Sequence, residues 1–254
     1  MKHTVIAACG CHMGKIRANN EDNFYFNGIM LPEENDALDR TLIMSCDTGK
    51  LPCFAVFDGM GGEQYGECAS YASAKRMKRF LEDGEGENLP PANRLIRLTL
   101  EMNKAVLTEA KKRLTRHMGS TMAGLFFEDD RAWAFNLGDS RVYSLNHGRL
   151  CQLSEDHVDS RALYSKKAKP SLTQHLGIDE EEFVVEPTIV GEMLENEKLF
   201  LLCSDGLTDM LSDVEIREIL CEHTEPAVIV ETLIDAALSR GGKDNMTVIV
   251  CKVR

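Results

Sequence analysis

The sequence predicts an α+β fold, a four-layer α-β-β-α sandwich with two central antiparallel sheets flanked by pairs of helices. Two patterns predict it. Apolar segments with the length of strands come in consecutive blocks, and segments with helical periodicity come in pairs between and after those blocks. The 254 residues are 43% hydrophobic, which is enough to bury a substantial core, so we expect one domain over residues 1–254.

Short strands are expected in the first third of the chain, at about 4–8, 24–28, 41–46 and 53–58. Two helices follow, from about Glu63 to Leu81 and from Ala92 to about Leu114, with a glycine-rich turn between them. The second helix carries an apolar stripe at helical spacing, formed by Leu95, Leu98, Met102, Ala105 and Val106.

A second block of strands is expected at about 121–127, 131–137, 141–145 and 150–153, the last two joined by the turn Asn146-His-Gly148. From 155 to 182 the chain is polar and rich in lysine and is longer than ordinary connections, which predicts either a functional flap or a mobile loop. Regular structure is expected to resume near Phe183.

The last third of the chain begins with a strand that ends at Ser204. Ser212 and Glu215 then have the spacing of a capping box, which predicts a helix to about Glu222. Another helix begins at Pro226 and ends at Gly241-Gly242, and a final strand follows.

Composition excludes several classes of function. A net charge of −12 argues against a general nucleic-acid binder, and the basic cluster Lys75-Arg-Met-Lys-Arg79 is interpreted as the solvated face of a helix. Nine irregularly spaced cysteines predict buried free thiols in a reducing compartment. No segment has the pattern of a secretory signal or a membrane span, so we expect a cytoplasmic protein without membrane association.

Four aspartates lie beside apolar runs that are predicted strands: Asp58, Asp139, Asp205 and Asp244. Strands that bring carboxylates to one end build a cage for hard divalent cations, and pairs of such cations activate water for attack on phosphate esters. The glycine-rich run after Asp58 matches neither of the nucleotide-binding motifs, G-x-G-x-x-G and the P-loop. A turn that lets the Gly59 carbonyl reach a metal explains the glycines better. The sequence therefore predicts a metal-dependent phosphohydrolase.

The first strand leaves a second mechanism open. Cys11 and Arg17 have the Cys-x5-Arg spacing of thiolate phosphatases, in which a cysteine of low pKa attacks phosphorus. However, Ala18 follows Arg17 where those enzymes usually carry Ser or Thr, and a thiolate mechanism leaves the aspartates unexplained. Arg17 also fits the metal mechanism, because its guanidinium can bind phosphate oxygens close to the acidic pair Glu21 and Asp22.

Six motifs, in order along nearly the whole chain, resemble those of the metal-dependent, type 2C (PPM) serine/threonine protein phosphatases. They are Arg17-Ala-Asn-Asn-Glu21-Asp22, Phe57-Asp58-Gly59-Met-Gly-Gly62, Gly119-Ser-Thr121, Asn136-Leu-Gly-Asp139-Ser-Arg141, Cys203-Ser-Asp205-Gly206-Leu-Thr-Asp209 and Lys243-Asp244-Asn245-Met-Thr247. Each motif is weak alone, whereas the ordered set is specific. Met60 and the compact length resemble the bacterial branch.

The resemblance implies a catalytic domain with two Mn²⁺ or Mg²⁺ ions at one end of the sheets. Asp58 would bridge both ions, Gly59 would offer its carbonyl to one, and Asp205 and Asp244 would complete the other. Asp139 would join Asp205 in a weaker third site. These residues carry the metal-binding part of the expected active site.

The resemblance also implies roles around the metals. Glu21 and Asp22 would hold metal-bound waters, Asn245 would support the shell around Asp244, and Arg17 would bind the substrate phosphate. A water bridging the two ions would hydrolyse phosphoserine or phosphothreonine without a phosphoenzyme. The partners would be phosphoproteins, substrates of a cognate Ser/Thr kinase, and a monomer is expected. The alternative is a pseudophosphatase that uses the same fold as a binding module.

The chain departs from the family pattern in places. Met60 stands where the mammalian branch carries a histidine proposed as general acid, and His12 and His157 are weak substitutes. Glu63 stands where bacterial relatives commonly carry a histidine. The flap is short and contains Lys166-Lys-Ala-Lys169, which would either select phosphopeptides by charge or form a disordered loop.

Overall fold

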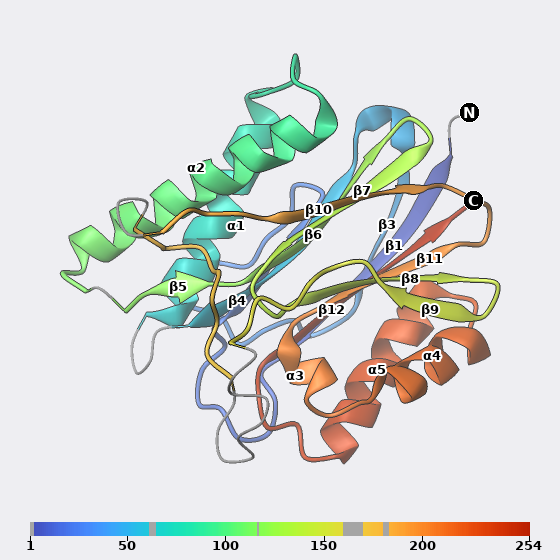
Figure 1. Cartoon of the computed structure of the whole chain (residues 1–254). Helices are drawn as coiled ribbons and strands as arrows, with labels where there is room; N and C mark the ends of the chain where they lie inside the picture. The colour runs from blue at the N-terminus through green and yellow to red at the C-terminus, as the bar shows by residue number, and fades with distance from the viewer. Residues whose placement is uncertain (1–2, 61–64, 116, 160–169, 180–182) are drawn as a thin grey trace.

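The computed structural model describes residues 3–60, 65–115, 117–159, 170–179 and 183–254, and their strands form two antiparallel sheets packed face to face (Figure 1). One sheet has the order β3-β1-β12-β11-β8-β9, with bounds Leu42–Asp47, Thr4–His12, Met246–Val253, Leu199–Cys203, Arg141–Asn146 and Arg149–Gln152. The other has the order β10-β7-β6-β4-β2, with bounds Thr188–Met193, Arg131–Leu137, Met122–Glu128, Cys53–Met60 and Asp22–Phe26, and the short β5 (Gly119–Ser120) pairs with β4.

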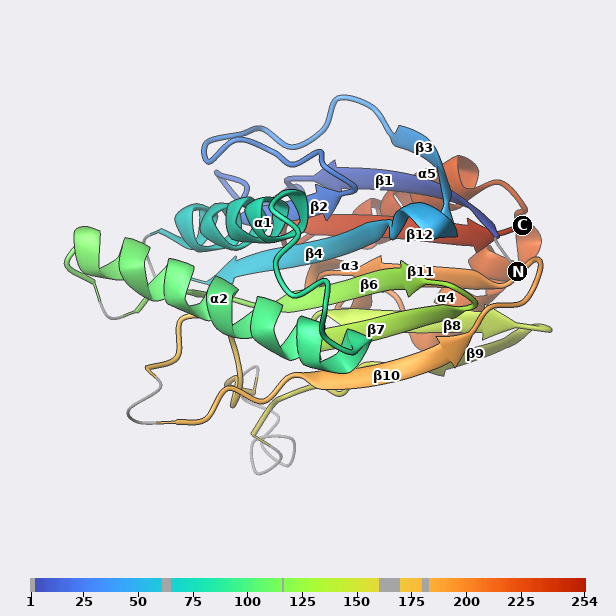
Figure 2. The ribbon, with the colours of Figure 1, turned by 90° about the horizontal axis from the view of Figure 1, so that it is seen from above.

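Helices cover the outer faces of both sheets. α1 (Gly66–Glu82) and α2 (Pro91–Lys112) lie on the sheet that contains β4, while α4 (Asp213–Glu222) and α5 (Pro226–Ser239) lie on the other (Figures 1 and 2). A one-turn helix, α3 (Asp205–Thr208), follows β11 directly. The predicted four-layer α+β sandwich is confirmed.

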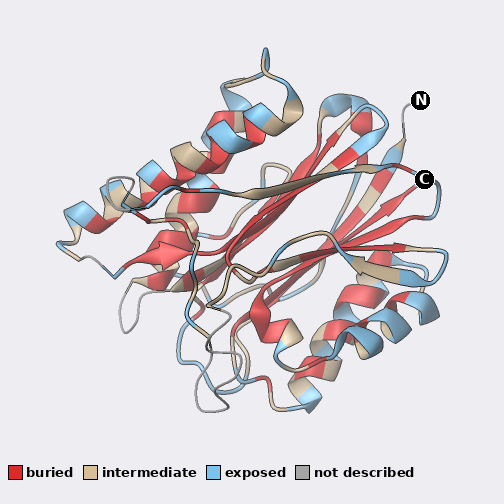
Figure 3. Ribbon diagram, viewed as in Figure 1, coloured by how far each residue is buried: buried red, intermediate tan, exposed pale blue. Residues whose placement is uncertain are grey.

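Aromatic side chains fill the space between the two sheets. Phe26, Phe54, Phe127 and Phe200 form a chain of tilted and edge-to-face contacts, with ring centroids 5.2, 6.2 and 5.9 Å apart. A further apolar cluster lies between each sheet and the helices that cover it. Most strand positions are therefore buried (Figure 3). This burial holds the strand ends, and whatever they carry, in fixed positions.

Local sequence signals explain most of the element boundaries. Ser212 and Glu215 form the predicted capping box of α4, and Pro226 stands at the first position of α5. In the β8–β9 hairpin, His147 and Gly148 both have positive φ, as a two-residue type I′ turn requires. Within the described residues, no helix is both long enough and apolar enough to span a membrane.

Several elements differ from the expectations. The first helix, α1, begins at Gly66, whereas the sequence predicted a start near Glu63. Residues 61–64 lie outside the described residues. Regular structure resumes at Thr188, where the edge strand β10 begins, and Phe183 belongs to the preceding loop. The helix α3 was not predicted, because one turn is too short to show a helical period.

Candidate metal centre and active site

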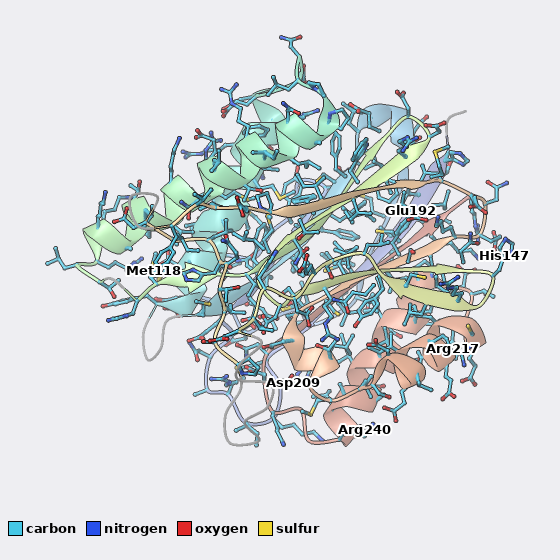
Figure 4. The ribbon with its side chains drawn as sticks, in the orientation of Figure 1. Met118, His147, Glu192, Asp209, Arg217 and Arg240 are labelled. Carbon is cyan, nitrogen blue, oxygen red and sulfur yellow. The ribbon has the colours of Figure 1, made fainter. Side chains whose placement is uncertain are left out.

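A cavity of about 490 Å³ opens at one end of the sheets and gathers eight of the nine predicted site residues. They are Arg17, Glu21, Asp58, Gly59, Asp139, Asp205, Asp244 and Asn245, and Asn19, Met60, Thr121, Pro170 and Leu172 complete the lining. In Figure 4, Asp209 at the end of α3 lies near this end of the sheets, and His147 at the tip of the β8–β9 hairpin marks the opposite end. The ninth predicted residue, Asp22, is not part of the lining.

Asp58 and Gly59 lie near the end of β4, and the backbone around Gly59 is too crowded for a side chain. A Cβ atom there would lie 2.0 Å from the Gly66 carbonyl oxygen and 2.6 Å from that of Glu21. The amide of Gly59 donates to the Glu21 carbonyl at 3.1 Å. The start of α1, the end of β4 and the segment before β2 therefore meet at one point, where only glycine fits.

Thr121 connects Asp58 with the loop that carries Asp139. Its amide donates to the Asp58 carbonyl at 2.8 Å, and its hydroxyl accepts from the Asp58 amide at 3.2 Å. The same hydroxyl lies 2.6 Å from that of Ser140, and all of Thr121 is buried. The motif Gly119-Ser-Thr121 was part of the resemblance without an assigned role, and the structure gives it one in positioning the carboxylates.

Asp205 is the first residue of α3 and is 8% exposed. The next residue, Gly206, packs against the chain at Asn245: a Cβ atom on Gly206 would lie 2.0 Å from the Asn245 carbonyl oxygen. This approach brings the end of β11 against the start of β12. As a result, Asp205 and Asp244 face the same cavity from neighbouring strands of one sheet.

The side chain of Asn245 fixes the segment that carries Arg17 and Glu21. Its amide group donates to the carbonyls of Met13 at 2.8 Å and Asn19 at 2.9 Å, and its oxygen accepts from the Glu21 amide at 2.8 Å. Asn245 is 4% exposed. Through these bonds, Asn245 supports the backbone of the segment that lies beside its neighbour Asp244.

Arg17 lies at the mouth of the cavity with half of its side chain exposed. Its Nη2 donates to Oδ2 of Asp244 at 2.6 Å, and this hydrogen bond raises the pKa of Arg17 above its usual range. A guanidinium at the mouth of an acidic cavity can reach both a carboxylate and an incoming phosphate.

Asp22 lies behind the cavity, 1% exposed, at the interface of the two sheets. Its Oδ2 accepts hydrogen bonds from the hydroxyls of Ser204 at 2.8 Å and Thr247 at 2.7 Å. Burial raises the pKa of Asp22 to about 7. The structure therefore separates this carboxylate from the eight residues that line the cavity.

The donor set of the cavity fits a hard divalent cation. Asp58, Asp139, Asp205 and Asp244 offer carboxylate oxygens, and the pKa of nearby Glu21 is raised by burial and by the charges of Glu67 and Asp244. Within the described part of the chain, no three His, Cys, Asp or Glu side chains already form a closed ligand cluster. Oxygen donors in an excess of negative charge are nevertheless the environment that Mg²⁺ and Mn²⁺ prefer.

Cys11 is not an activated nucleophile. It is 2% exposed and lies inside β1 instead of on a phosphate-binding loop. Its Sγ accepts from the Asn20 side-chain amide at 3.4 Å and lies 3.3 Å from the Thr247 hydroxyl, which donates to Asp22. Burial and the charge of Asp22 raise the pKa of its thiol to about 12. A thiol that stays protonated cannot attack phosphorus, so the structure contradicts the thiolate mechanism.

The flap borders the cavity through Pro170 and Leu172. Leu172 pairs with Val158 in an isolated bridge, which holds the two described ends of the flap together. The lysine-rich run 166–169 and Glu63 lie outside the described residues.

Asp209 ends one of the six motifs without an assigned role, and it is not among the residues that line the cavity. Asp209 follows α3, and its amide donates to the carbonyl of Asp205 at 2.8 Å, so the two aspartates are one helical turn apart. Residues spaced by four on a helix share a face. The spacing is visible in the sequence, but it becomes informative only once the one-turn helix is known.

Bacterial serine/threonine phosphatases are similar to this chain over nearly its whole length. PstP of Mycobacterium tuberculosis (strain CDC 1551 / Oshkosh), a serine/threonine protein phosphatase, is 31% identical over 251 residues; the match covers 94% of this chain but only 43% of PstP. The serine/threonine phosphatase Stp of Listeria monocytogenes (strain EGD-e) is 30% identical, with 93% of this chain and 91% of Stp covered.

Solved structures have the same fold. PppA of Pseudomonas aeruginosa superposes with a TM-score of 0.79 at 27% identity, and the match covers 100% of both chains. The catalytic domain of PstP, determined in complex with two manganese ions, superposes with a TM-score of 0.76 at 29% identity over 98% of this chain and 99% of that one. The family model of protein phosphatase 2C matches residues 34–228. This chain therefore belongs to the protein phosphatase 2C family.

Proposed function

We propose that this chain is a metal-dependent protein serine/threonine phosphatase that hydrolyses phosphoserine and phosphothreonine without a phosphoenzyme. One observation carries the proposal: four aspartates from separate strand ends, Gly59 and Arg17 all line a single open cavity. The family to which the chain belongs, and a solved relative with two manganese ions, support a two-metal site of this type.

Asp58, Gly59, Asp205 and Asp244 would hold two Mn²⁺ or Mg²⁺ ions, and Asp139 would join Asp205 at a weaker third ion. Bound ions of this kind supply Lewis-acid chemistry: they lower the pKa of water and offset the charge of the phosphate. Glu21, with Asn245 holding its backbone amide, would orient water at the rim of the cavity.

Arg17 would bind and orient the phosphate group. In its present position it neutralises Asp244, and its half-exposed side chain can turn from that carboxylate towards an incoming phosphate. Asp244 would then be available to a cation. Arg17 and the metal site would thus share the charge of the phosphate oxygens while Asn245 keeps the backbone beneath them in place.

Protonation of the leaving group would come from solvent. No histidine is among the described residues that line the cavity, and Met60 stands there instead. Nδ1 of His12 accepts from the Gly14 amide at 2.8 Å, and His157 is held between the Gly138 amide and the Thr188 hydroxyl. Both rings are committed to structural hydrogen bonds, whereas the open cavity admits water.

The substrates would be phosphoproteins made by a cognate Ser/Thr kinase, and the protein would act as a monomer in the cytoplasm. All nine cysteines are free thiols, which suits a reducing compartment.

Release of phosphate from a phosphothreonine peptide, with and without Mn²⁺, tests the proposal. We expect metal-dependent turnover by the wild type, a loss of about 100-fold or more in Asp205→Asn, and near-normal turnover in Cys11→Ser. Loss of activity only in the cysteine variant, with activity resistant to EDTA, would restore the thiolate mechanism. Inactivity of every form on diverse phosphopeptides would favour a binding module.

A further inference from the structure

α1 and α2 lie side by side on the outer face of one sheet (Figures 1 and 2). A groove lies between these two helices. It encloses about 490 Å³. Three small side chains, Ala72 on α1 and Ala105 and Thr108 on α2, line it and leave space between the helices. The hydroxyl of Thr108 donates to the carbonyl of Lys104 at 2.7 Å, so it turns back to its own helix.

The groove is basic in a chain whose net charge is −12. Five cationic side chains line it, against two carboxylates: Lys75, Arg76, Arg79, Lys104 and Lys112 face Glu101 and Glu109. The net charge of the lining is therefore three positive. The cluster that the sequence presented as a solvated helix face is one wall of this groove, and α2 supplies the opposite wall.

Both carboxylates in the groove are already neutralised. Glu101 accepts from Arg76 at 2.9 Å and from Lys104 at 3.5 Å. Glu109 pairs with Lys112 at 3.0 Å and with Arg113 at 3.2 Å.

Two cations remain without a carboxylate. Lys75 and Arg79 are exposed and form no ion pair with any of the described residues; the ammonium of Lys75 lies 5.1 Å from the ring centre of Tyr71. Being four residues apart on α1, they point from the same face of that helix. Two unneutralised cations beside a groove favour an anionic occupant.

The groove lies within reach of a peptide whose phosphate is in the active-site cavity. α1 begins at Gly66, which packs directly against Gly59 in that cavity. At 1.5 Å per helical residue, Lys75 and Arg79 lie about 14 and about 20 Å along α1 from this point. An extended peptide spans about 3.3 Å per residue, so about four to six residues would bridge the two places.

We propose that this groove is a docking site for an acidic segment of the phosphoprotein substrate, with Asp or Glu side chains about four to six positions from the phosphorylated residue. Lys75 and Arg79 bind the carboxylates of that segment, and the small residues between the helices admit its backbone. The inference rests on the proposed phosphatase activity, because the phosphate in the cavity sets the register of the peptide.

Two matched phosphothreonine peptides test this inference. One carries three glutamates four to six residues from the phosphothreonine, and the other carries serines at the same positions. Each pair is made twice, with the glutamates or serines on the N-terminal or on the C-terminal side of the phosphothreonine. We expect the wild type to show a KM about tenfold lower for the acidic peptide on one side, with similar kcat. The double variant Lys75→Glu/Arg79→Glu loses this preference, and its hydrolysis of p-nitrophenyl phosphate is unchanged. Lys78→Glu/Lys111→Glu makes the same change in net charge outside the groove and keeps the preference.

Three outcomes would overturn the docking site: equal KM for both peptides in the wild type, retention of the preference in the groove variant, or equal loss in the two double variants, which would indicate general electrostatic attraction. Failure of the phosphatase proposal has a separate signature, namely no Mn²⁺-dependent hydrolysis of p-nitrophenyl phosphate by the wild type. In that case, fluorescence anisotropy with the unphosphorylated acidic peptide still tests whether the groove binds an acidic segment. Binding that Lys75→Glu/Arg79→Glu abolishes supports an acidic docking groove, and absence of binding refutes it.

Discussion

The hydroxyl of Thr247 donates a 2.7 Å hydrogen bond to the carboxylate of Asp22, although Asp22 belongs to β2 of one sheet and Thr247 to β12 of the other. Both side chains are almost fully buried. The bond therefore joins the two sheets directly behind the cavity, at the end of the sandwich where the proposed metal ligands gather. Removing it should loosen the very region that positions those ligands.

Thr247→Val keeps the shape of the side chain and removes its hydroxyl. Because a buried carboxylate then loses a donor, we expect the free energy of unfolding to fall by about 1.5–3 kcal/mol in urea denaturation. Thr232→Val is the matched control, since the half-buried Thr232 donates its hydroxyl to Val228 within its own helix. The control should change stability by about 0.5 kcal/mol or less. Equal effects of the two substitutions would refute a structural role for the Asp22–Thr247 bond.

Burial of Asp22 predicts a dependence of stability on pH in the metal-free protein. Its pKa is raised to about 7, whereas an unfolded aspartate titrates near 3.9. Between these values the folded state holds the proton and the unfolded state does not. The contribution of Asp22 is therefore fully present below pH 4 and is lost as the pH rises through 7.

Urea titrations in EDTA at pH 5, 6 and 7 measure this effect against Asp22→Asn, which does not titrate. The wild type should lose about 1 kcal/mol per pH unit relative to the variant. A constant difference across the three pH values would show that Asp22 is ionised throughout.

The sequence could predict the layers of the fold and which residues line the cavity. It predicted less well the direction in which a single side chain points. Strand blocks, helix pairs and the capping box at Ser212 are local patterns, and the structure confirms them. Asp22 shows the limit. Every residue of β2 is buried, so the strand has no polar alternation that would reveal which face Asp22 occupies. Its partners Ser204 and Thr247 lie 182 and 225 residues away, which no local pattern can pair.

Gly59→Ala should disable the active site because the added methyl group would collide with the backbone of Gly66 and Glu21. We expect at least a tenfold loss of affinity for Mn²⁺ by isothermal titration calorimetry, together with loss of turnover. Gly148→Ala serves as the control. Its surroundings are open and only its left-handed backbone is strained, so it should cost about 1 kcal/mol of stability and leave metal binding intact. Normal metal affinity in Gly59→Ala would contradict the close packing at this point.

Metal removal should lower the melting temperature, because the carboxylates of the cavity repel one another until cations neutralise them. At a Mn²⁺ concentration 100 times the dissociation constant, binding stabilises the folded state by about 2.7 kcal/mol. Differential scanning calorimetry with Mn²⁺ and with EDTA measures the difference, and Asp205→Asn should reduce it. An unchanged melting temperature after confirmed removal of metal would argue against a metal centre in this cavity.

Asp139→Ala separates the roles of the four aspartates. Asp139 lies in the loop between β7 and β8, whereas Asp58, Asp205 and Asp244 adjoin β4, β11 and β12 in the packed middle of the sheets. If Asp139 serves the weaker third ion, its loss should leave two tight Mn²⁺ ions per chain in calorimetric titration, while turnover of a phosphothreonine peptide falls about 10-fold or more. Asp58→Ala should instead abolish tight binding, because the Asp58 carboxylate would serve both ions. Loss of the two tight ions in Asp139→Ala would show that this loop belongs to the principal metal site, and the division of labour among the four carboxylates would have to be reassigned.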